Sequence, residues 1–213
     1  MINYKKFISF LMPWLTIALI MNLARFSMTD VSSYVYMNWN LFLAVIPLLF
    51  VFLFEKTNSK YLKTFYFFAW LFFLPNAAYI VTDLIHLRDV GPEWMLWFDG
   101  MMIFAYAVLG IFISSYSILK MKINIFSKSI LKQNIFLGLI SLVSSFGIYL
   151  GRYIRFNTWD ILSNPLELAT SVSSIISEKY SEPVFVTTIV FFSIFIYMAT
   201  VSLENLLEKK KEA

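Results

Sequence analysis

A few ionisable residues stand beside long apolar segments of this chain, and two of them suit acid–base chemistry. His86, the single histidine, follows Asp83 by three residues, and Asp99 lies further along the chain. A carboxylate can orient an imidazole that acts as a general base, so Asp83, His86 and Asp99 are the candidate catalytic residues. Three scattered side chains make a poor metal site. We therefore assign no metal, and the sequence identifies no cofactor.

Asp83 and His86 continue a polar stripe that begins with Asn76 and Tyr79. The four residues fall at i, i+3, i+7 and i+10, which places them on one face of an α-helix. Pro75 precedes the stripe and is expected to bend the helix, opening that face to water. The alternative is structural: the first two residues then join helices by hydrogen bonds, and the last two lie among lipid headgroups.

Two arginines mark a second candidate region. Tyr149, Arg152 and Arg155 are spaced by three, so an α-helix would carry all of them on one face. Paired guanidinium groups favour a planar anion such as phosphate or carboxylate, but they are equally suited to neutralise Asp83 and Asp99 in an internal ion network. The candidate ligand-binding residues are Asn76, Tyr79, Asp83, His86, Asp99, Tyr149, Arg152, Arg155, Asn157 and Asp160.

Other polar and small residues flank these two regions. Arg25, Asn38 and Asn40 are placed to complete the rim of a site, although each alone is typical of an interfacial anchor or a helix cap. Gly147 and Gly151 form a G-x-x-x-G pair, which allows close helix packing on one side.

The composition indicates what kind of element must position these residues. Of the 213 residues, 60% are hydrophobic and 14% are charged, against about 45–50% and about 25% in soluble domains. A chain this short cannot bury so much apolar surface away from water, so lipid must solvate it. These values exclude a soluble enzyme and a nucleic-acid-binding domain, and the absence of cysteine excludes disulfides.

Six segments are apolar enough to span a membrane, which takes about 20 residues in a helix. We predict an all-α fold, a six-transmembrane-helix bundle forming a single integral-membrane domain over residues 1–213. The predicted spans are 7–26, 39–54, 61–82, 94–119, 133–151 and 184–203.

The basic residues predict the orientation of these spans. Most of the 17 Lys and Arg residues lie near the two termini and in alternate loops, and cytoplasmic loops of membrane proteins are enriched in Lys and Arg. We therefore expect both termini in the cytoplasm. Lys120, Lys122, Lys128 and Lys132 are expected in one of these cytoplasmic loops, as a solvated charged surface.

One longer segment, 152–183, separates the last two spans on the opposite side. Within it Asn164, Pro165 and Glu167 have the spacing of a helix N-cap, a first-turn proline and a capping-box acid. We expect a short amphipathic helix on the outer membrane surface, either covering the ends of the spans or acting as a lid. Its apolar residues at helical spacing are Leu168, Val172, Ile175 and Ile176.

These motifs together resemble an uncharacterised family of bacterial integral-membrane proteins, domain of unknown function 1361, over roughly residues 35–205. The matching stretches are Asn40-Leu41-Phe42-Leu43-Ala44, Ile46-Pro47-Leu48, Leu74-Pro75-Asn76, Asp83-Leu84-Ile85-His86-Leu87, Trp97-Phe98-Asp99, Gly147-Ile148-Tyr149-Leu150-Gly151-Arg152 and Asn157-Thr158-Trp159-Asp160. Ala78, Phe98 and Phe156 depart from the usual residues, Pro, Tyr and Trp. The resemblance implies a bacterial cytoplasmic-membrane protein and brings no established activity.

The sequence favours a binding protein whose polar pocket faces the extracytoplasmic side and takes an anionic small molecule or a lipid headgroup. One alternative is a membrane-embedded enzyme acting on outer-leaflet lipid or cell-envelope precursors, with Arg152 and Arg155 stabilising a phosphoryl group. Another is an accessory subunit whose outer segment packs against a protein partner that the sequence does not identify. The lipid bilayer is the one partner that the composition itself requires, and no nucleic-acid partner is expected.

Overall fold

The apolar segments form six long helices, each long and apolar enough to cross a membrane. The computed structural model describes residues 4–29, 34–88, 93–127, 129–175, 177 and 181–212. The long helices are α1 (Tyr4–Thr29), α2 (Tyr36–Lys56), α3 (Lys60–Tyr79), α4 (Leu96–Ile125), α5 (Ile130–Tyr149) and α8 (Pro183–Glu212). No strand occurs in the described residues. The predicted all-α bundle of six candidate membrane helices is therefore confirmed.

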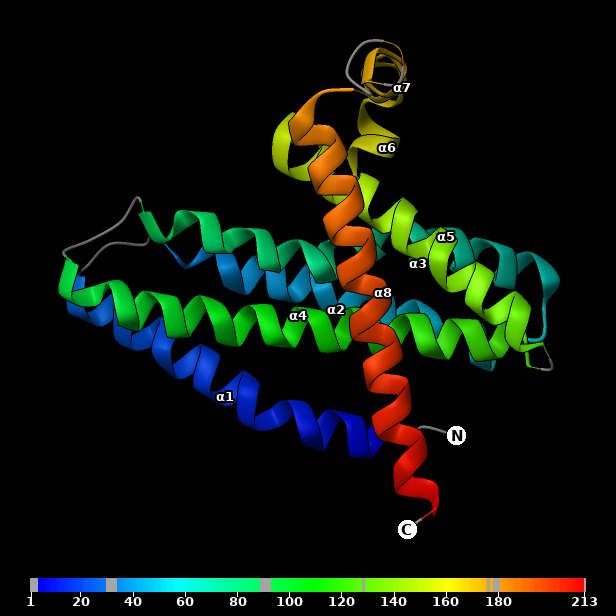
Figure 1. The fold of residues 1–213 in the computed structure, drawn as a ribbon, viewed down its shortest axis with the longest axis horizontal. Coiled ribbons are helices and arrows are strands. Elements are labelled where there is room, and N and C mark those ends of the chain that lie inside the picture. Colours follow the sequence, from blue (N-terminus) through cyan, green and yellow to red (C-terminus); the bar gives the residue numbers. More distant parts are fainter. Residues whose placement is uncertain are drawn as a thin grey trace.

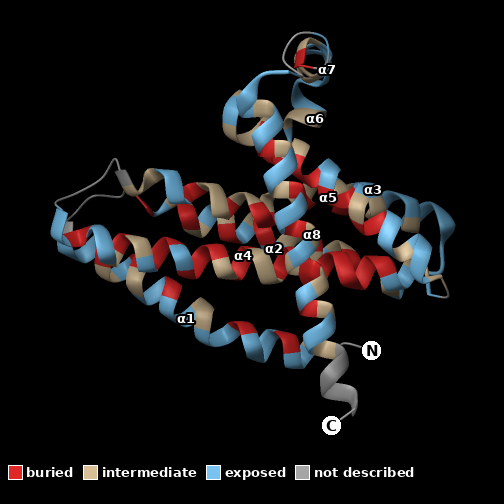
Figure 2. Ribbon diagram, viewed as in Figure 1, coloured by how far each residue is buried: buried red, intermediate tan, exposed pale blue. Residues whose placement is uncertain are grey.

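Helix α4 is the centre of the bundle, and it packs against each of the other five long helices. In its most apolar stretch 83% of the residues are buried, against 17% in α1 and in α8 (Figure 2). Helix α8 crosses α4 and α5 steeply (Figure 1). Large apolar side chains such as Ile20, Leu23 and Phe191 are exposed on the two peripheral helices. Lipid rather than water is the solvent that suits such surfaces.

The start of α1 and the end of α8 lie near each other (Figure 1). Tyr4 donates a hydrogen bond to Glu55 at the end of α2, and Glu204 of α8 binds Lys122 at the end of α4. We call this the terminal end. The polar residues described below lie away from this end, near the start of α2 and of α4 and the end of α3.

Two lysines that we expected in a solvated loop are instead buried in α4, which continues to Ile125. Lys120 Nζ lies 2.7 Å from Glu55 Oε1, and Lys122 Nζ lies 2.6 Å from both carboxylate oxygens of Glu204. These lysines can be buried because carboxylates on α2 and α8 satisfy charges that hydropathy alone places in water. Lys128, expected in the same loop, and Ile176, expected on the outer helix, lie outside the described residues.

Helix α3 changes its winding within the polar stripe, between Tyr79 and Asp83. The α-helix ends at Tyr79 and continues as a 3₁₀ helix, η2 (Ile80–Arg88), and the next described element is the short η3 (Glu93–Met95). Thr82 Oγ1 donates to the Tyr79 carbonyl oxygen at 2.7 Å, which satisfies one acceptor at this transition.

Helix α5 also changes its winding at its end. A π-helical turn, η4 (Leu150–Ile154), follows Tyr149, and Arg155 then takes a left-handed conformation with φ 65°. The helices α6 (Asp160–Ser163) and α7 (Pro165–Ser174) come next. The expected short helix is present with proline in its first turn, but Asn164 makes no side-chain capping hydrogen bond.

The G-x-x-x-G pair lies against α3, as its spacing predicts. A Cβ atom on Gly147 would come within 2.4 Å of Pro75 Cγ, and one on Gly151 within 3.3 Å of Tyr79 Cε2. Glycine is required at residue 147 because the proline ring occupies the space of any side chain. This contact brings the end of α5 onto the polar stripe of α3.

Candidate functional site

Arg152 joins the end of α5 to the polar stripe of α3. Its Nη2 lies 3.0 Å from His86 Nε2, and its Nη1 lies 3.4 Å from Tyr79 Oη and 3.5 Å from Asp83 Oδ1. Its guanidinium carbon also lies 5.9 Å from the centre of the Tyr79 ring. Three of the predicted stripe residues therefore meet one predicted arginine.

Both changes of winding contribute to this meeting. A 3₁₀ helix has three residues per turn, so Asp83 and His86 project in the same direction from η2. A π-helical turn accommodates Arg152 in η4, and such turns are frequent at functional sites. The side chain at residue 151 is only a hydrogen, which lets the Tyr79 ring approach the backbone.

The partners of Asp83 and His86 determine what these groups can do. Asp83 is 1% exposed and accepts a hydrogen bond of 3.1 Å from Asn40 Nδ2. A guanidinium group can only donate, so His86 Nε2 accepts from Arg152 and the ring proton is on Nδ1. The Tyr36 ring packs edge-on against the imidazole at 5.9 Å between centroids. His86 is thus oriented toward Arg152, and its Nε2 lone pair is engaged.

Asp99 belongs to a different cluster. Arg25 Nε lies 2.6 Å from Asp99 Oδ1, Arg25 Nη2 lies 3.2 Å from Asp99 Oδ2, and both side chains are buried. The internal ion network that we considered for Asp99 and the two later arginines is therefore not what forms. The interfacial-anchor alternative for Arg25 is also wrong, because its guanidinium reaches inward to α4.

A chain of uncharged groups lies beside this ion pair, and sequence reasoning missed most of it. Tyr106 Oη donates to Asn38 Oδ1 at 2.5 Å, and Asn38 Nδ2 donates to Asn22 Oδ1 at 3.0 Å. Asn22 Nδ2 donates to the Tyr34 carbonyl oxygen at 2.9 Å, and Tyr34 Oη to the His86 carbonyl oxygen at 3.5 Å. Asn22 lies inside the first predicted span, 7–26, and this polar residue in an apolar segment was the signal that could have revealed these hydrogen bonds.

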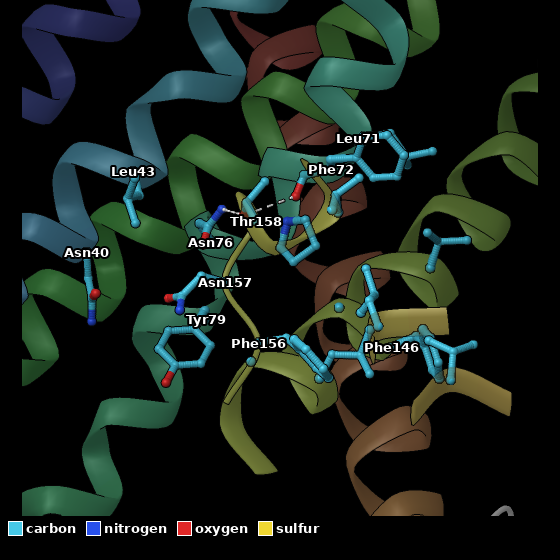
Figure 3. Close-up of a pocket in the computed structure, with 18 of the residues that line it drawn as sticks. Asn40, Leu43, Leu71, Phe72, Asn76, Tyr79, Phe146, Phe156, Asn157 and Thr158 are labelled. Carbon is cyan, nitrogen blue, oxygen red and sulfur yellow. Dashed lines mark hydrogen bonds between the residues drawn. The ribbon is translucent and has the colours of Figure 1, made fainter. Parts of the chain in front are cut away.

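A cavity of about 380 Å³ lies next to Arg152, Asp83 and His86, which we call the Arg152 cluster. Figure 3 shows residues that line this cavity. This volume is in the range of small-molecule sites, about 300–1,000 Å³. Asn40 and Tyr79 line the cavity and also contact the charged cluster. The lining residues are Trp39, Asn40, Leu43, Leu71, Phe72, Pro75, Asn76, Tyr79, Val143, Phe146, Gly147, Leu150, Gly151, Phe156, Asn157, Thr158, Ile161, Leu168 and Val172.

The cavity is polar on one side and apolar on the other. Asn40, Asn76 and Asn157 gather on one side in Figure 3, while Phe146 and Leu71 lie on the other. None of the lining residues is charged. Helix α7 contributes Leu168 and Val172, so this face of the amphipathic helix covers the cavity.

The structure separates the remaining predicted residues from Arg152. Asn76 binds Thr158 Oγ1 at 2.9 Å instead, and Tyr149 packs against the Phe185 ring of α8 at 5.0 Å. Arg155 is exposed, and the shared face that we expected for it fails because the α-helix ends before it. Asp160 accepts a hydrogen bond of 2.6 Å from the Asn157 backbone N–H. Among the described residues no group of His, Cys, Asp or Glu side chains is placed to hold a metal ion.

The fold and the six apolar helices define a polytopic membrane protein with a part-apolar, part-polar cavity at one end of the bundle. The chain belongs to the family described as protein of unknown function (DUF1361), whose model matches residues 39–198. The matched region holds every residue of the Arg152 cluster but not α1, which supplies Arg25. No curated protein and no solved structure was found to match the chain.

Proposed function

We propose that this chain is a membrane-embedded binding protein for an amphiphile whose anionic group binds Arg152 and whose apolar part occupies the cavity. The strongest support is that Asn40 and Tyr79 line the cavity and also form hydrogen bonds with the Arg152 cluster. The sequence suggested an anionic ligand, and we now propose that this ligand also has an apolar part. A free anion alone would not suit a cavity that is largely apolar.

Arg25, which is buried, and Arg152, which is partly exposed, differ in how far their charge is satisfied. Arg25 and Asp99 form two short contacts and are 3% and 2% exposed, so that pair is closed. The Arg152–Asp83 contact is 3.5 Å, and the Arg152 side chain retains 14% exposure. The Asp83 carboxylate also accepts a hydrogen bond from Asn40, so Arg152 is not its only partner. Arg152 is therefore the cation that is left able to receive an anionic group.

The same geometry favours binding over acid–base catalysis. A general base needs a lone pair directed at substrate, and His86 directs Nε2 at Arg152. The accessory-subunit alternative draws on the apolar residues of the segment before α8. Two of them, Leu162 and Leu166, are exposed, whereas Leu168 and Val172 line the cavity and are unavailable to a partner.

Membrane location completes the proposal. We propose one integral-membrane domain over 1–213 in a bacterial cytoplasmic membrane, with the terminal end in the cytoplasm and the cavity near the extracytoplasmic surface. This rests on the Lys and Arg distribution, now without Lys120 and Lys122, whose charges are paired. Labelling of single cysteines introduced at either terminus in intact cells tests the orientation, since external accessibility would contradict it.

The binding proposal is tested with the full chain in phosphatidylcholine nanodiscs, measuring retention of dodecyl phosphate and of dodecanol by native mass spectrometry. We expect dodecyl phosphate to be retained in preference to dodecanol. The Arg152→Gln variant should lose this preference by about tenfold or more, because a charge-assisted contact is lost. The Arg155→Gln variant is the matched control and should keep it. Equal retention of both probes by the original chain would refute the proposal.

A further inference from the structure

The chemistry of the α3 face changes in a fixed order along its length. Leu71 and Phe72 line the apolar part of the cavity, Asn76 lines its polar side, and Tyr79 leads to the ionic pair of Asp83 and Arg152. Because an α-helix rises about 1.5 Å per residue and a 3₁₀ helix about 2.0 Å, these three zones follow one another along the helix axis. The amides lie between the apolar zone and the charged zone.

The orientation of two of these amides follows from what they bind. Asn40 Nδ2 donates to the Asp83 carboxylate, and Asn76 Nδ2 donates to the Phe73 carbonyl oxygen at 3.0 Å. Carboxylate and carbonyl oxygens only accept, so each NH₂ group must face its partner. The Oδ1 atoms of Asn40 and Asn76 are then left as acceptors on cavity-lining residues.

Asn157 and Thr158 complete this side of the cavity. Thr158 Oγ1 accepts from Asn76 at 2.9 Å and has the Phe72 carbonyl oxygen at 3.5 Å for its own proton. The Asn157 side chain makes no hydrogen bond within the part of the chain that the structure describes, although its backbone N–H binds Asp160. The polar side therefore presents the side-chain amide oxygens of Asn40, Asn76 and Asn157, none of which accepts a hydrogen bond within the described residues.

We infer that the bound amphiphile carries an uncharged hydrogen-bond donor, such as a hydroxyl group, between its anionic and apolar parts. This inference rests on the proposed function, because Arg152 and the apolar zone define the two ends of the ligand. A ligand hydroxyl donates to Oδ1 of Asn40 or Asn76 and accepts from the Asn157 amide. No charged residue lines the cavity, so this middle group is neutral.

Two probes that differ by one donor test the inference. The first is a lysophosphatidic acid with its central glycerol hydroxyl free, and the second is the same molecule with that hydroxyl methylated. Both have a phosphate at one end and a single acyl chain at the other. We expect the full chain in phosphatidylcholine nanodiscs to bind the hydroxyl probe about threefold to tenfold more tightly, the range for one hydrogen bond.

The Asn157→Ala variant should reduce this ratio without affecting folding, because its side chain holds no other residue in the described structure. The Asn164→Ala variant, outside the cavity lining, is the control and should leave the ratio unchanged. Equal binding of both probes that still depends on Arg152 would overturn the inference and leave the proposed function intact. Failure of both probes to bind would overturn both.

Discussion

Arg25 and Asp99 form a closed ion pair between α1 and α4, in which Nε lies 2.6 Å from Oδ1 and Nη2 lies 3.2 Å from Oδ2. Both side chains are buried, and the Arg25 guanidinium also lies over the Tyr34 ring, 5.6 Å from its centroid. This pair attaches a peripheral helix to the centre of the bundle. We regard it as structural, in contrast to the more open contact between Arg152 and Asp83.

The first prediction concerns the stability supplied by this pair. The Asp99→Ala variant removes the carboxylate that binds the buried Arg25 guanidinium, which should lower the free energy of unfolding by about 3–5 kcal/mol. The double variant Arg25→Met/Asp99→Leu should recover most of the loss, since an apolar pair needs no ionic partner. Equilibrium unfolding in detergent measures both. An Asp99→Ala variant as stable as the original chain would show that the pair is not structural.

The second prediction concerns competition for Arg152. The Asp83→Asn variant removes the carboxylate 3.5 Å from Nη1 while its amide oxygen can still accept from Asn40. An anionic probe then meets less competition, so dodecyl phosphate should bind severalfold more tightly in nanodiscs. The Asp160→Asn variant serves as the control, since the Asp160 carboxylate accepts hydrogen bonds from Asn157 and Ser163, three residues away on either side. Weaker binding by correctly folded Asp83→Asn would argue against Arg152 as the anion site.

The third prediction uses two residues of α7 with opposite surroundings. Leu168 lines the cavity, whereas Leu166 is 82% exposed. The Leu168→Trp variant should fill part of the cavity and weaken dodecyl phosphate binding at least severalfold, because the apolar part loses its space. The Leu166→Trp variant should bind as the original chain does. Unchanged binding by both variants would mean that the ligand does not enter beneath α7.

The fourth prediction compares two glycines in spanning helices. A Cβ atom on Gly110 would lie 2.2 Å from the Ala77 carbonyl oxygen, whereas one on Gly138 meets nothing within 4 Å. Gly110→Ala should lower the free energy of unfolding by about 1–3 kcal/mol through overpacking of α3 on α4. Gly138→Ala should raise it by about 0.5–1 kcal/mol, because alanine restricts the unfolded chain. Thermal unfolding of the two variants in the same detergent distinguishes these outcomes.

The fifth prediction concerns the left-handed residue that ends the π-helical turn. Arg155 has φ 65°, a conformation that costs an L-residue about 1–2 kcal/mol. Arg155→Gly should therefore be at least as stable as the original chain. Arg155→Ile should lower the free energy of unfolding by more than about 1–2 kcal/mol, since a β-branched side chain suits φ > 0 poorly. Both should bind dodecyl phosphate normally. Loss of binding in Arg155→Gly would place this arginine in the site.

The sequence alone determined the all-α fold class and the presence of six helices that are apolar and long enough to span a membrane. Apolar length is a property of each segment by itself, so α2 and α5 could be placed without knowing their neighbours. The close approach of α5 to α3 was also readable, because Gly147 and Gly151 recur at the spacing of one helix face. The polar residues were found for the same local reason, since they interrupt apolar runs.

The tertiary structure decided which charges meet. A regular α-helix would have placed Arg155 beside Arg152, but the π-helical turn and the left-handed residue that follows separate them. Asp99 meets Arg25 rather than a later arginine because α1 packs on α4, and Lys122 is buried because α8 brings Glu204 to it. Side-chain spacing within one helix reports a shared face, whereas ion pairing depends on the packing and register between helices, which no single segment contains.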